Sequence, residues 1–318
     1  MDIIHWLLEG DVSIQYQTYR DLLNQNIPEL RNRIHKEGFG KSLLDLQSSN
    51  GHWGGGYYHY KWINTHYTLL ELRRLNIITQ PSIMDVINDI LLVNKTDDGG
   101  IMSNPKVWKF SDVCMNGMNL NSMCYFSVDE NKLVSVIDFI VLQQLQDGGF
   151  NCSYNYAKYG AKHSSLHSTI SMIEGFNSYI NHGYTYRLQE IKKLRDDSIE
   201  FILMHRLFKS DRTGEIINKK FTMLSYPPRW RYDILRALEA FREASIEYDE
   251  RMQDAFDVIL SKRFKNGTWP VQNKHPGKVH FEMEQIGKPS RWNTLRVLRV
   301  LKHFFPKSNY IENQKGYY

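Results

Sequence analysis

A turn built on glycine recurs about every fifty residues in this chain of 318 residues, and it limits the folds that the sequence can adopt. The turns read QSSNGHW ending at Trp53, KTDDGGI at Ile101, QLQDGGF at Phe150, KSDRTGEI at Ile216 and RFKNGTW at Trp269, with successive gaps of 48, 49, 66 and 53 residues. Before each turn, apolar residues recur at spacings of three and four, which indicates an amphipathic helix. After each turn, an irregular stretch leads into a second helical segment.

Helix pairs of this period stack on one another, because a single pair cannot cover its own apolar face. Strand patterns are almost absent, so we expect an all-α fold, either an open superhelix or a closed ring of helix pairs. Residues 11–25, DVSIQYQTYRDLLNQ, predict an extra N-terminal helix that is capped by Asp11 or Ser13 and closes the ring. We expect one domain over residues 1–305, with turns near 47–53, 95–101, 144–150, 209–216 and 263–269, and a polar tail over 306–318.

Composition excludes several classes of protein. The hydrophobic content of 42% can form a sizeable core, and no apolar run approaches the roughly 18 residues of a membrane helix. The net charge of +5 is spread along the chain without a basic block, so we expect no nucleic-acid partner, although a basic cavity for an anion remains open. The start of the chain is unlike a secretory signal, and the three cysteines do not form a disulfide framework. These features favour a cytoplasmic protein with reduced thiols.

Two of the turns match a known element. Residues 47–53 and 144–150 fit the Q-x-x-x-G-x-W/F element of squalene–hopene cyclases, and the other three turns agree with it more loosely. The chain therefore resembles the α/α-toroid superfamily of terpenoid cyclases and protein prenyltransferase β subunits. The resemblance implies an α/α toroid of about five helix pairs plus the N-terminal helix, in which the Gln and the aromatic residue tie neighbouring outer helices together.

In a ring of helices, the residues that open the inner helices are candidates for function, because those ends face a central cavity. The openings contain Trp62, Thr65, His66, Asp112, Cys114, His163, His167, Arg229, Trp230, Asp233, Arg291, Trp292 and Thr294. Asp112, Cys114 and His167 offer a carboxylate, a thiolate and an imidazole, which are the ligands of a catalytic zinc with a fourth position left open. An Asp-x-Cys is equally the pattern of a helix cap followed by a buried cysteine.

The order SDVC, QLQDGGF, SSLHSTISMIEG resembles the order of elements in protein prenyltransferase β subunits. The resemblance implies that Asp112, Cys114 and His167 bind zinc, which lowers the pKa of an acceptor thiol that attacks an allylic diphosphate. It also implies that Lys106, Lys109 and His66 contact the diphosphate, and that a separate helical-repeat subunit is a partner. His163 lies four residues before His167, so on one helix the two would share a face and either could be the ligand.

The remaining candidates concern substrate contacts and acid–base chemistry. Arg229 and Arg291 occupy equivalent places in PPRWRYDILRAL and SRWNTLRVLRVL, where they either clamp an anion or make ring-closing contacts. Asp233 and Glu282 are acid–base candidates beside them. We expect Trp62, Trp230, Trp292 and His163 to contribute to the wall of the substrate site.

Residues 196–200, DDSIE, resemble the magnesium-binding Asp-Asp-x-x-Asp/Glu element of class I terpene synthases, so magnesium stays open as a cofactor. The partner element is absent, which favours acids at the start of an outer helix. The leading hypothesis is a zinc-dependent, prenyltransferase-like enzyme that binds an isoprenoid diphosphate or a similar hydrophobic or anionic ligand. The alternatives are a terpene-cyclase-like or carbohydrate-active toroid enzyme without zinc, or a non-catalytic toroid that binds a ligand or a protein.

Overall fold

The computed structural model describes residues 2–108, 110–152, 155 and 159–307, and this part of the chain is mostly helical, as expected. Lys109 and residues 308–318 of the expected tail lie outside the described residues. The elements are α1 (Ile3–Leu8), α2 (Val12–Gln17), the π-helical turn η1 (Thr18–Leu22), α3 (Pro28–Arg33), α4 (Gly38–Asp45), α5 (Thr65–Arg74), α6 (Pro81–Val93), α7 (Val113–Tyr125), α8 (Glu130–Val141), α10 (Leu166–Asn181), α11 (Leu188–Met204), η2 (Lys219–Thr222), α12 (Ile234–Glu243), η3 (Glu250–Met252), α13 (Gln253–Ser261), β1 (Trp269–Pro270), β2 (Pro289–Ser290) and α14 (Arg291–Phe304).

Each glycine turn lies between two helices: α4 and α5, α6 and α7, α8 and α10, α11 and α12, and α13 and α14. A glycine in every turn has a positive φ, in chain order Gly51 at 80°, Gly99 at 89°, Gly148 at 86°, Gly214 at 72° and Gly267 at 89°. Residues with a Cβ rarely adopt this conformation, so the sequence repeat is explained by the backbone of the turn.

The residue that ends a turn is hydrogen-bonded to the helix that follows. The backbone N–H groups of Trp53, Phe150 and Trp269 each donate over 3.0 Å to a threonine hydroxyl in the first turn of the next helix. The acceptors are Thr65, Thr169 and Thr294. In the second turn the acceptor is the side-chain oxygen of Asn116, 2.8 Å from the N–H of Ile101. These bonds set where each following helix starts.

The glutamine and tryptophan of the first turn tie it to the preceding and neighbouring helices. The Gln47 amide donates to the carbonyl of Gly51 over 2.8 Å and to that of Ser82, in the first turn of α6, over 3.2 Å. The indole N–H of Trp53 donates to the carbonyl of Leu43 in α4 over 2.6 Å. The Gln47 contact links the turn that follows α4 to the start of α6.

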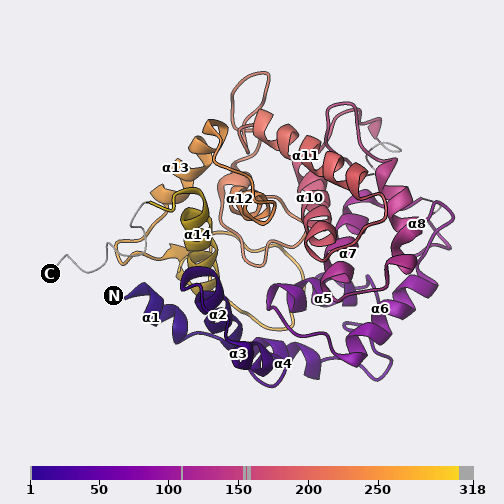
Figure 1. Ribbon diagram of the computed structural model, residues 1–318, viewed down its shortest axis with the longest axis horizontal. Helices are drawn as coiled ribbons and strands as arrows, with labels where there is room; N and C mark the ends of the chain where they lie inside the picture. The colour runs from indigo at the N-terminus through magenta and orange to yellow at the C-terminus, as the bar shows by residue number, and fades with distance from the viewer. Residues whose placement is uncertain (1, 109, 153–154, 156–158, 308–318) are drawn as a thin grey trace.

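Helices α5, α7, α10, α12 and α14 contact one another in that order, and α14 contacts α2 and η1. The circuit closes through α2 and α4, because α2 contacts α4 and α4 contacts α5. Figure 1 shows these helices around the middle of the molecule, with α6, α8, α11 and α13 outside them. The expected helix at 11–25 appears as α2 and η1, and Asp11 caps it by accepting the N–H of Ser13 over 2.8 Å. None of the described helices combines the length and apolar character needed to cross a membrane.

Helices α7 and α10 pack at close range because both carry a glycine at their contact. A Cβ at Gly117 would lie 2.7 Å from the carbonyl oxygen of Ser171, and one at Gly175 would lie 2.6 Å from the carbonyl oxygen of Gly117. Neither position has room for a side chain. The two helices that carry the predicted zinc ligands are therefore held backbone to backbone.

One local expectation is wrong. Residues 196–200, DDSIE, do not open a helix, because α11 begins eight residues earlier, at Leu188. Asp196 and Asp197 form ion pairs with Arg195 and Lys193 of the same helix. The segment lies in the middle of α11, and its acidic side chains face solvent and form ion pairs within the helix.

The hydrogen bond that ends the third turn is open to a direct test. We expect Thr169→Val to lower the free energy of unfolding by roughly 1 to 3 kcal/mol, because it leaves the buried N–H of Phe150 without an acceptor at nearly unchanged side-chain volume. Urea unfolding measures this loss. Thr169→Ser keeps the hydroxyl, so it should lose less than half as much free energy of unfolding. Equal losses in both variants would contradict the role of the bond.

Candidate functional site

Three side chains with metal-ligand chemistry lie together at the start of α7. The candidate ligand atoms of Asp112, Cys114 and Cys152 all lie within 4.8 Å of one another. The two sulfurs are 3.4 Å apart, and the Cys152 sulfur is also 3.4 Å from the Ser168 hydroxyl oxygen. Asp112 caps α7, since its Oδ1 accepts the N–H of Cys114 over 3.0 Å. One carboxylate and two thiols are a donor set that suits zinc.

Cys152 is the member of this cluster that the sequence prediction missed. The segment after the third turn runs back along the start of α10, where the carbonyl of Phe150 accepts the N–H of Ser165 over 2.8 Å and the Asn151 amide donates to the carbonyl of His163 over 2.8 Å. Because α10 packs closely on α7, the next residue, Cys152, reaches Cys114. The sequence feature that could have identified Cys152 is its position: it is one of three cysteines in the chain and lies two residues after the end of a glycine turn.

His167 is not a member of the cluster. It lies in the first turn of α10, its Nδ1 accepts the N–H of Tyr232 over 2.8 Å, and its ring packs against Trp230 with centroids 5.1 Å apart. Burial, with the charges of Arg231 and Arg236, lowers the pKa of His167 to about 4, so the imidazole is neutral at pH 7. The residue that lies beside Asp112 and Cys114 is therefore Cys152, and not His167 as the sequence predicts.

His163 does not share a helix face with His167, because α10 begins only at Leu166 and His163 precedes it in an exposed stretch. Lys106 is exposed on the segment before α7, and Lys109 lies outside the described residues. His66 is buried between α5 and α7, and its Nδ1 is 2.9 Å from the side-chain oxygen of Asn119. Burial lowers the pKa of His66 to about 4, so it is a neutral packing residue at pH 7.

Aromatic side chains surround Cys114. Trp62, Tyr67, Leu70 and Met118 form a small buried cluster, and Tyr58, Cys114 and Trp230 pack against it. Burial raises the pKa of Tyr58, with a further contribution from the charge of a Cys114 thiolate. Trp62 and Trp230 thus lie beside the thiol site, where the sequence predicted walls of a substrate pocket.

The groups around Cys114 determine whether its thiol is protonated. Its hydrogen bond with Cys152, burial and the nearby carboxylate of Asp112 together raise the pKa of Cys114. The thiol is therefore protonated at neutral pH when no cation balances the cluster. A divalent cation reverses this preference, because a coordinated thiol is deprotonated outright.

The two arginines that look equivalent in sequence have different partners. Arg229 is buried, with an Nη1 atom 3.2 Å from Glu71 and its guanidinium 5.6 Å from the ring centre of Trp62. Arg291 donates to the carbonyl of Trp6 over 2.9 Å and lies over the Trp6 ring, so it joins α1 to α14. Arg291 is thus a ring-closing residue in this structure, while Arg229 lies at a cavity.

That cavity has a volume of about 240 Å³ and is lined by Arg229, Trp62, Glu71 and the segment from Lys274 to Glu284. Glu282 lies at its exposed edge and pairs with Lys274. Asp233 does not line it; this buried residue caps α12 and accepts the N–H of Arg236 over 2.9 Å. Of the predicted catalytic group, Arg229 and Glu282 therefore share this cavity, whereas Asp233 and Arg291 lie elsewhere.

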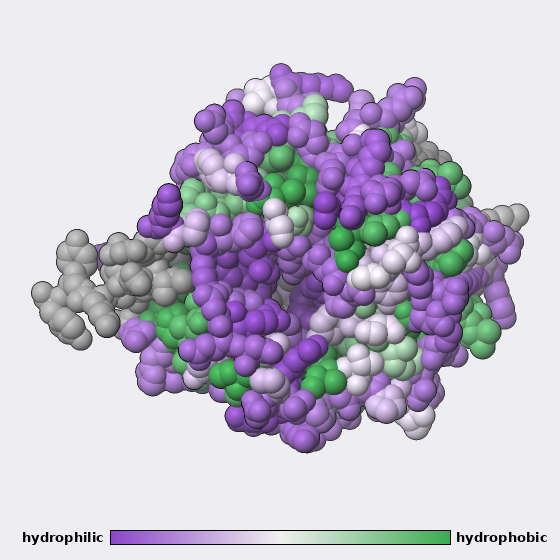
Figure 2. Space-filling model, in the orientation of Figure 1, coloured by the Kyte–Doolittle hydropathy of each residue, from purple (hydrophilic) through white to green (hydrophobic). Residues whose placement is uncertain are grey.

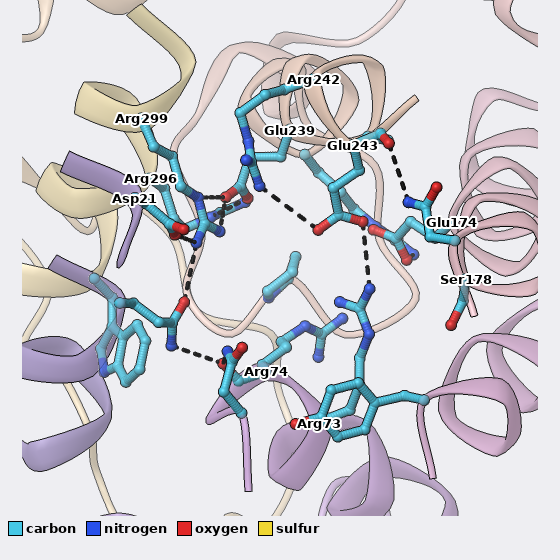
Figure 3. Close-up of a pocket in the computed structure, with 18 of the residues that line it drawn as sticks. Asp21, Arg73, Arg74, Glu174, Ser178, Glu239, Arg242, Glu243, Arg296 and Arg299 are labelled. Atoms are coloured by element: carbon cyan, nitrogen blue, oxygen red, sulfur yellow. Dashed lines mark hydrogen bonds and ion pairs between the residues drawn. The ribbon is translucent and has the colours of Figure 1, made fainter. Parts of the chain in front are cut away.

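A larger cavity of about 430 Å³ lies in the middle of the molecule. The sequence left a basic cavity for an anion open, but it indicated none of the charged residues that line this one. Figure 2 shows hydrophilic residues around a hollow on this face, and Figure 3 shows charged side chains that converge on it. Its charged lining consists of Arg20, Arg73, Arg74, Arg236, Arg242, Arg296, Arg299, Asp21, Glu174, Glu239 and Glu243. Of the predicted substrate residues, Trp292 lines it and stacks on Tyr226 with ring centres 5.0 Å apart. The sequence feature that could have identified these arginines is their occurrence at inward-facing positions of inner helices, as in TLRVLRVL.

Arginines lower the pKa of three carboxylates of this cavity, Asp21, Glu174 and Glu239. Burial opposes the ionisation of Glu239, but the charges of Arg296 and Arg299 lower its pKa to about 2. Burial likewise opposes the ionisation of Asp21, but its hydrogen bonds with Arg20 and the charge of Arg299 lower its pKa to about 2. Glu174 accepts two hydrogen bonds from Arg236, at 2.7 and 2.8 Å. The arginines therefore face a framework of fixed negative charges.

No protein-family model and no curated protein matches the chain.

The ion pairs of the cavity predict a loss of stability in acid. The folded-state pKa of Glu239 lies below its ordinary value, so the pair stabilises the protein above about pH 4.5 and this contribution is lost as the pH falls towards 2. The contribution is on the order of 3 kcal/mol. Urea unfolding between pH 5 and 2 should show a weaker pH dependence for Glu239→Gln than for wild type. The exposed Glu247→Gln serves as control and should keep the wild-type slope.

Proposed function

We propose that the protein is a zinc-dependent, prenyltransferase-like enzyme of the α/α-toroid type, with zinc held by Asp112, Cys114 and Cys152. The observation that carries the proposal is the convergence of these three ligand atoms within 4.8 Å of one another. They come from two segments that the third turn and the α7–α10 contact bring together.

The toroid part of the proposal is supported by the repeated turns and by the closed circuit of helix contacts. Five helix pairs, with α2 and η1 between the last and the first, account for that circuit. The contact of Gln47 with Ser82 is of the kind expected for cyclase-like turns. An open superhelix would leave α14 without α2 and η1 as neighbours.

Zinc fits the cluster better than magnesium does. Thiolates are soft ligands, and zinc accepts them together with a carboxylate oxygen, whereas magnesium requires oxygen ligands throughout. Three protein ligands leave a fourth position for a substrate group, as in catalytic zinc sites. In this arrangement, magnesium would belong elsewhere, with a phosphate of the substrate.

Zinc, when bound, would supply charge that lowers the pKa of a thiol or of water at the open position. The residues of the chain have separate tasks. Asp112 is oriented by the N–H of Cys114, which leaves its second oxygen for the cation. Tyr58, Trp62 and Trp230 offer an aromatic wall for an isoprenoid chain and keep water from it. Lys106, on the exposed segment before α7, is available to a diphosphate.

The metal is tested by elemental analysis of protein purified without added metal. We expect about one zinc per chain in wild type and its loss in Cys114→Ser and in Cys152→Ser. Cys124→Ser is the matched control, since Cys124 is a buried cysteine of the same helix outside the cluster. A wild type without metal, or equal loss in the control, contradicts the site.

His167→Ala separates the two ligand sets. If Cys152 is the third ligand, this variant keeps its zinc, whereas loss of zinc here with retention in Cys152→Ser would restore the imidazole set that the sequence predicts. Transfer is then tested with radiolabelled isoprenoid diphosphates of different chain lengths and a thiol acceptor. Zinc without transfer would leave a metal site but overturn the prenyltransferase-like function.

A further inference from the structure

We propose that the central cavity, hereafter the arginine cavity, binds a compact multivalent oxyanion, either a phosphorylated or a polycarboxylate small molecule with two or three negative charges. The site does not depend on the zinc cluster, because none of Asp112, Cys114 and Cys152 lines it. Its volume of about 430 Å³ lies within the range of small-molecule sites.

The charge of the arginine cavity is unbalanced. Its described lining contains seven arginines and four carboxylates, an excess of three positive charges. Guanidinium groups cannot lose their proton in a protein, so this excess persists at every pH at which the protein folds. Enclosed charge of one sign is costly unless a partner neutralises it. The ligand that best removes the cost carries two or three negative charges.

Most of these arginines are already occupied. Arg236 is held by Glu174, by the carbonyl of Arg231 and by the hydroxyl of Ser171. Arg296 and Arg299 share Glu239, and Arg299 also contacts Asp21. These residues form a rigid wall rather than the site of contact with a ligand.

Arg73 of α5 and Arg242 of α12 are the least satisfied. Both depend on Glu243, at 3.3 Å for Arg73 and 3.8 Å for Arg242, and the buried Nε atom of each has no hydrogen-bond partner among the described residues. Figure 3 shows the two arginines on either side of Glu243 at the cavity. Two guanidinium groups with free donors match the paired oxygens of a phosphate or carboxylate.

The wall supplies further unused donors. Tyr226 and Trp292 line the cavity as a stacked pair, both are at most 3% exposed, and neither the Tyr226 hydroxyl nor the Trp292 indole N–H has a partner in the described part of the chain. Buried polar groups are normally hydrogen-bonded, so unpaired donors at a cavity indicate a missing acceptor. An oxyanion would be such an acceptor.

Helix dipoles account for only part of this charge. Arg73 and Arg74 lie in the last turn of α5 and Arg242 in that of α12, where cations are favoured. Arg236 lies in the first turn of α12 and Arg296 lies within α14, where the dipole gives no such preference. Helix ends therefore explain the positions of Arg73, Arg74 and Arg242, but not those of Arg236 and Arg296.

The test measures the melting temperature and the binding heat of wild type with pyrophosphate and with citrate, each against sodium chloride at equal ionic strength. We expect one or both anions to raise the melting temperature beyond the chloride control and to bind one per chain. A response to pyrophosphate alone assigns a phosphorylated ligand, and a response to citrate alone assigns a polycarboxylate. If both anions act only as chloride does, the proposal is overturned.

Variants locate the anion. Arg242→Gln and Arg73→Gln should each weaken binding at least tenfold. Arg33→Gln should not, because Arg33 is an exposed residue of α3 that pairs with Glu37. Without anion, Arg242→Gln should melt no lower than wild type, because it removes surplus positive charge; this readout separates binding from a structural role. Cys114→Ser should keep the response, and its loss there, or an equal loss in Arg33→Gln, would overturn a separate anion site.

Discussion

The backbone N–H at the end of a glycine turn, bonded to a side chain in the first turn of the next helix, is the contact on which the rest of the structure depends. Thr65, Asn116, Thr169 and Thr294 provide the acceptor in four of the turns. Each bond fixes where a helix begins and brings the turn against that start. These bonds hold each helix in place whatever the course of the loop before it. The cluster at the start of α7 and the arginine cavity between the helices both depend on this placement.

The interior enclosed by these helices is divided by chemistry. Near the start of α7, two thiols and a carboxylate lie together, and one of the thiols, Cys114, packs against a cluster that contains Trp62 and Tyr67. The larger cavity is lined by ion pairs, in which Glu239 and Asp21 remain ionised because arginines outnumber the carboxylates. Arg236 lies near both regions: it is bonded to Glu174 at the cavity, and a negative charge on Cys114 would raise its pKa. One fold thus contains a cluster of two thiols and a carboxylate and a separate cavity that is rich in arginine.

The success of sequence reasoning varied with the range of the interaction. The turns, the helix that follows each of them and the N-terminal helix at 11–25 were predicted, because glycine conformation and apolar periodicity are local signals. Asp112 and Cys114 were paired correctly because they are two residues apart on one helix start. Cys152 was missed, His163 was assigned to a helix that begins after it, and DDSIE was assigned to a helix start. Arg229 and Arg291 were treated as copies, although only tertiary neighbours, Glu71 and Trp6, distinguish them.

By itself, the sequence determined the turn positions, the mostly helical fold and the presence of a thiol and a carboxylate on one helix cap, since each depends on residues close together in the chain. Only the tertiary structure decided which groups meet. Cys152 reaches Cys114 because Gly117 and Gly175 let α7 and α10 approach at backbone distance. The arginines of α5, α12 and α14 face one cavity because the circuit of helix contacts turns them inward. Such meetings depend on distances between segments far apart in sequence, which no local pattern encodes.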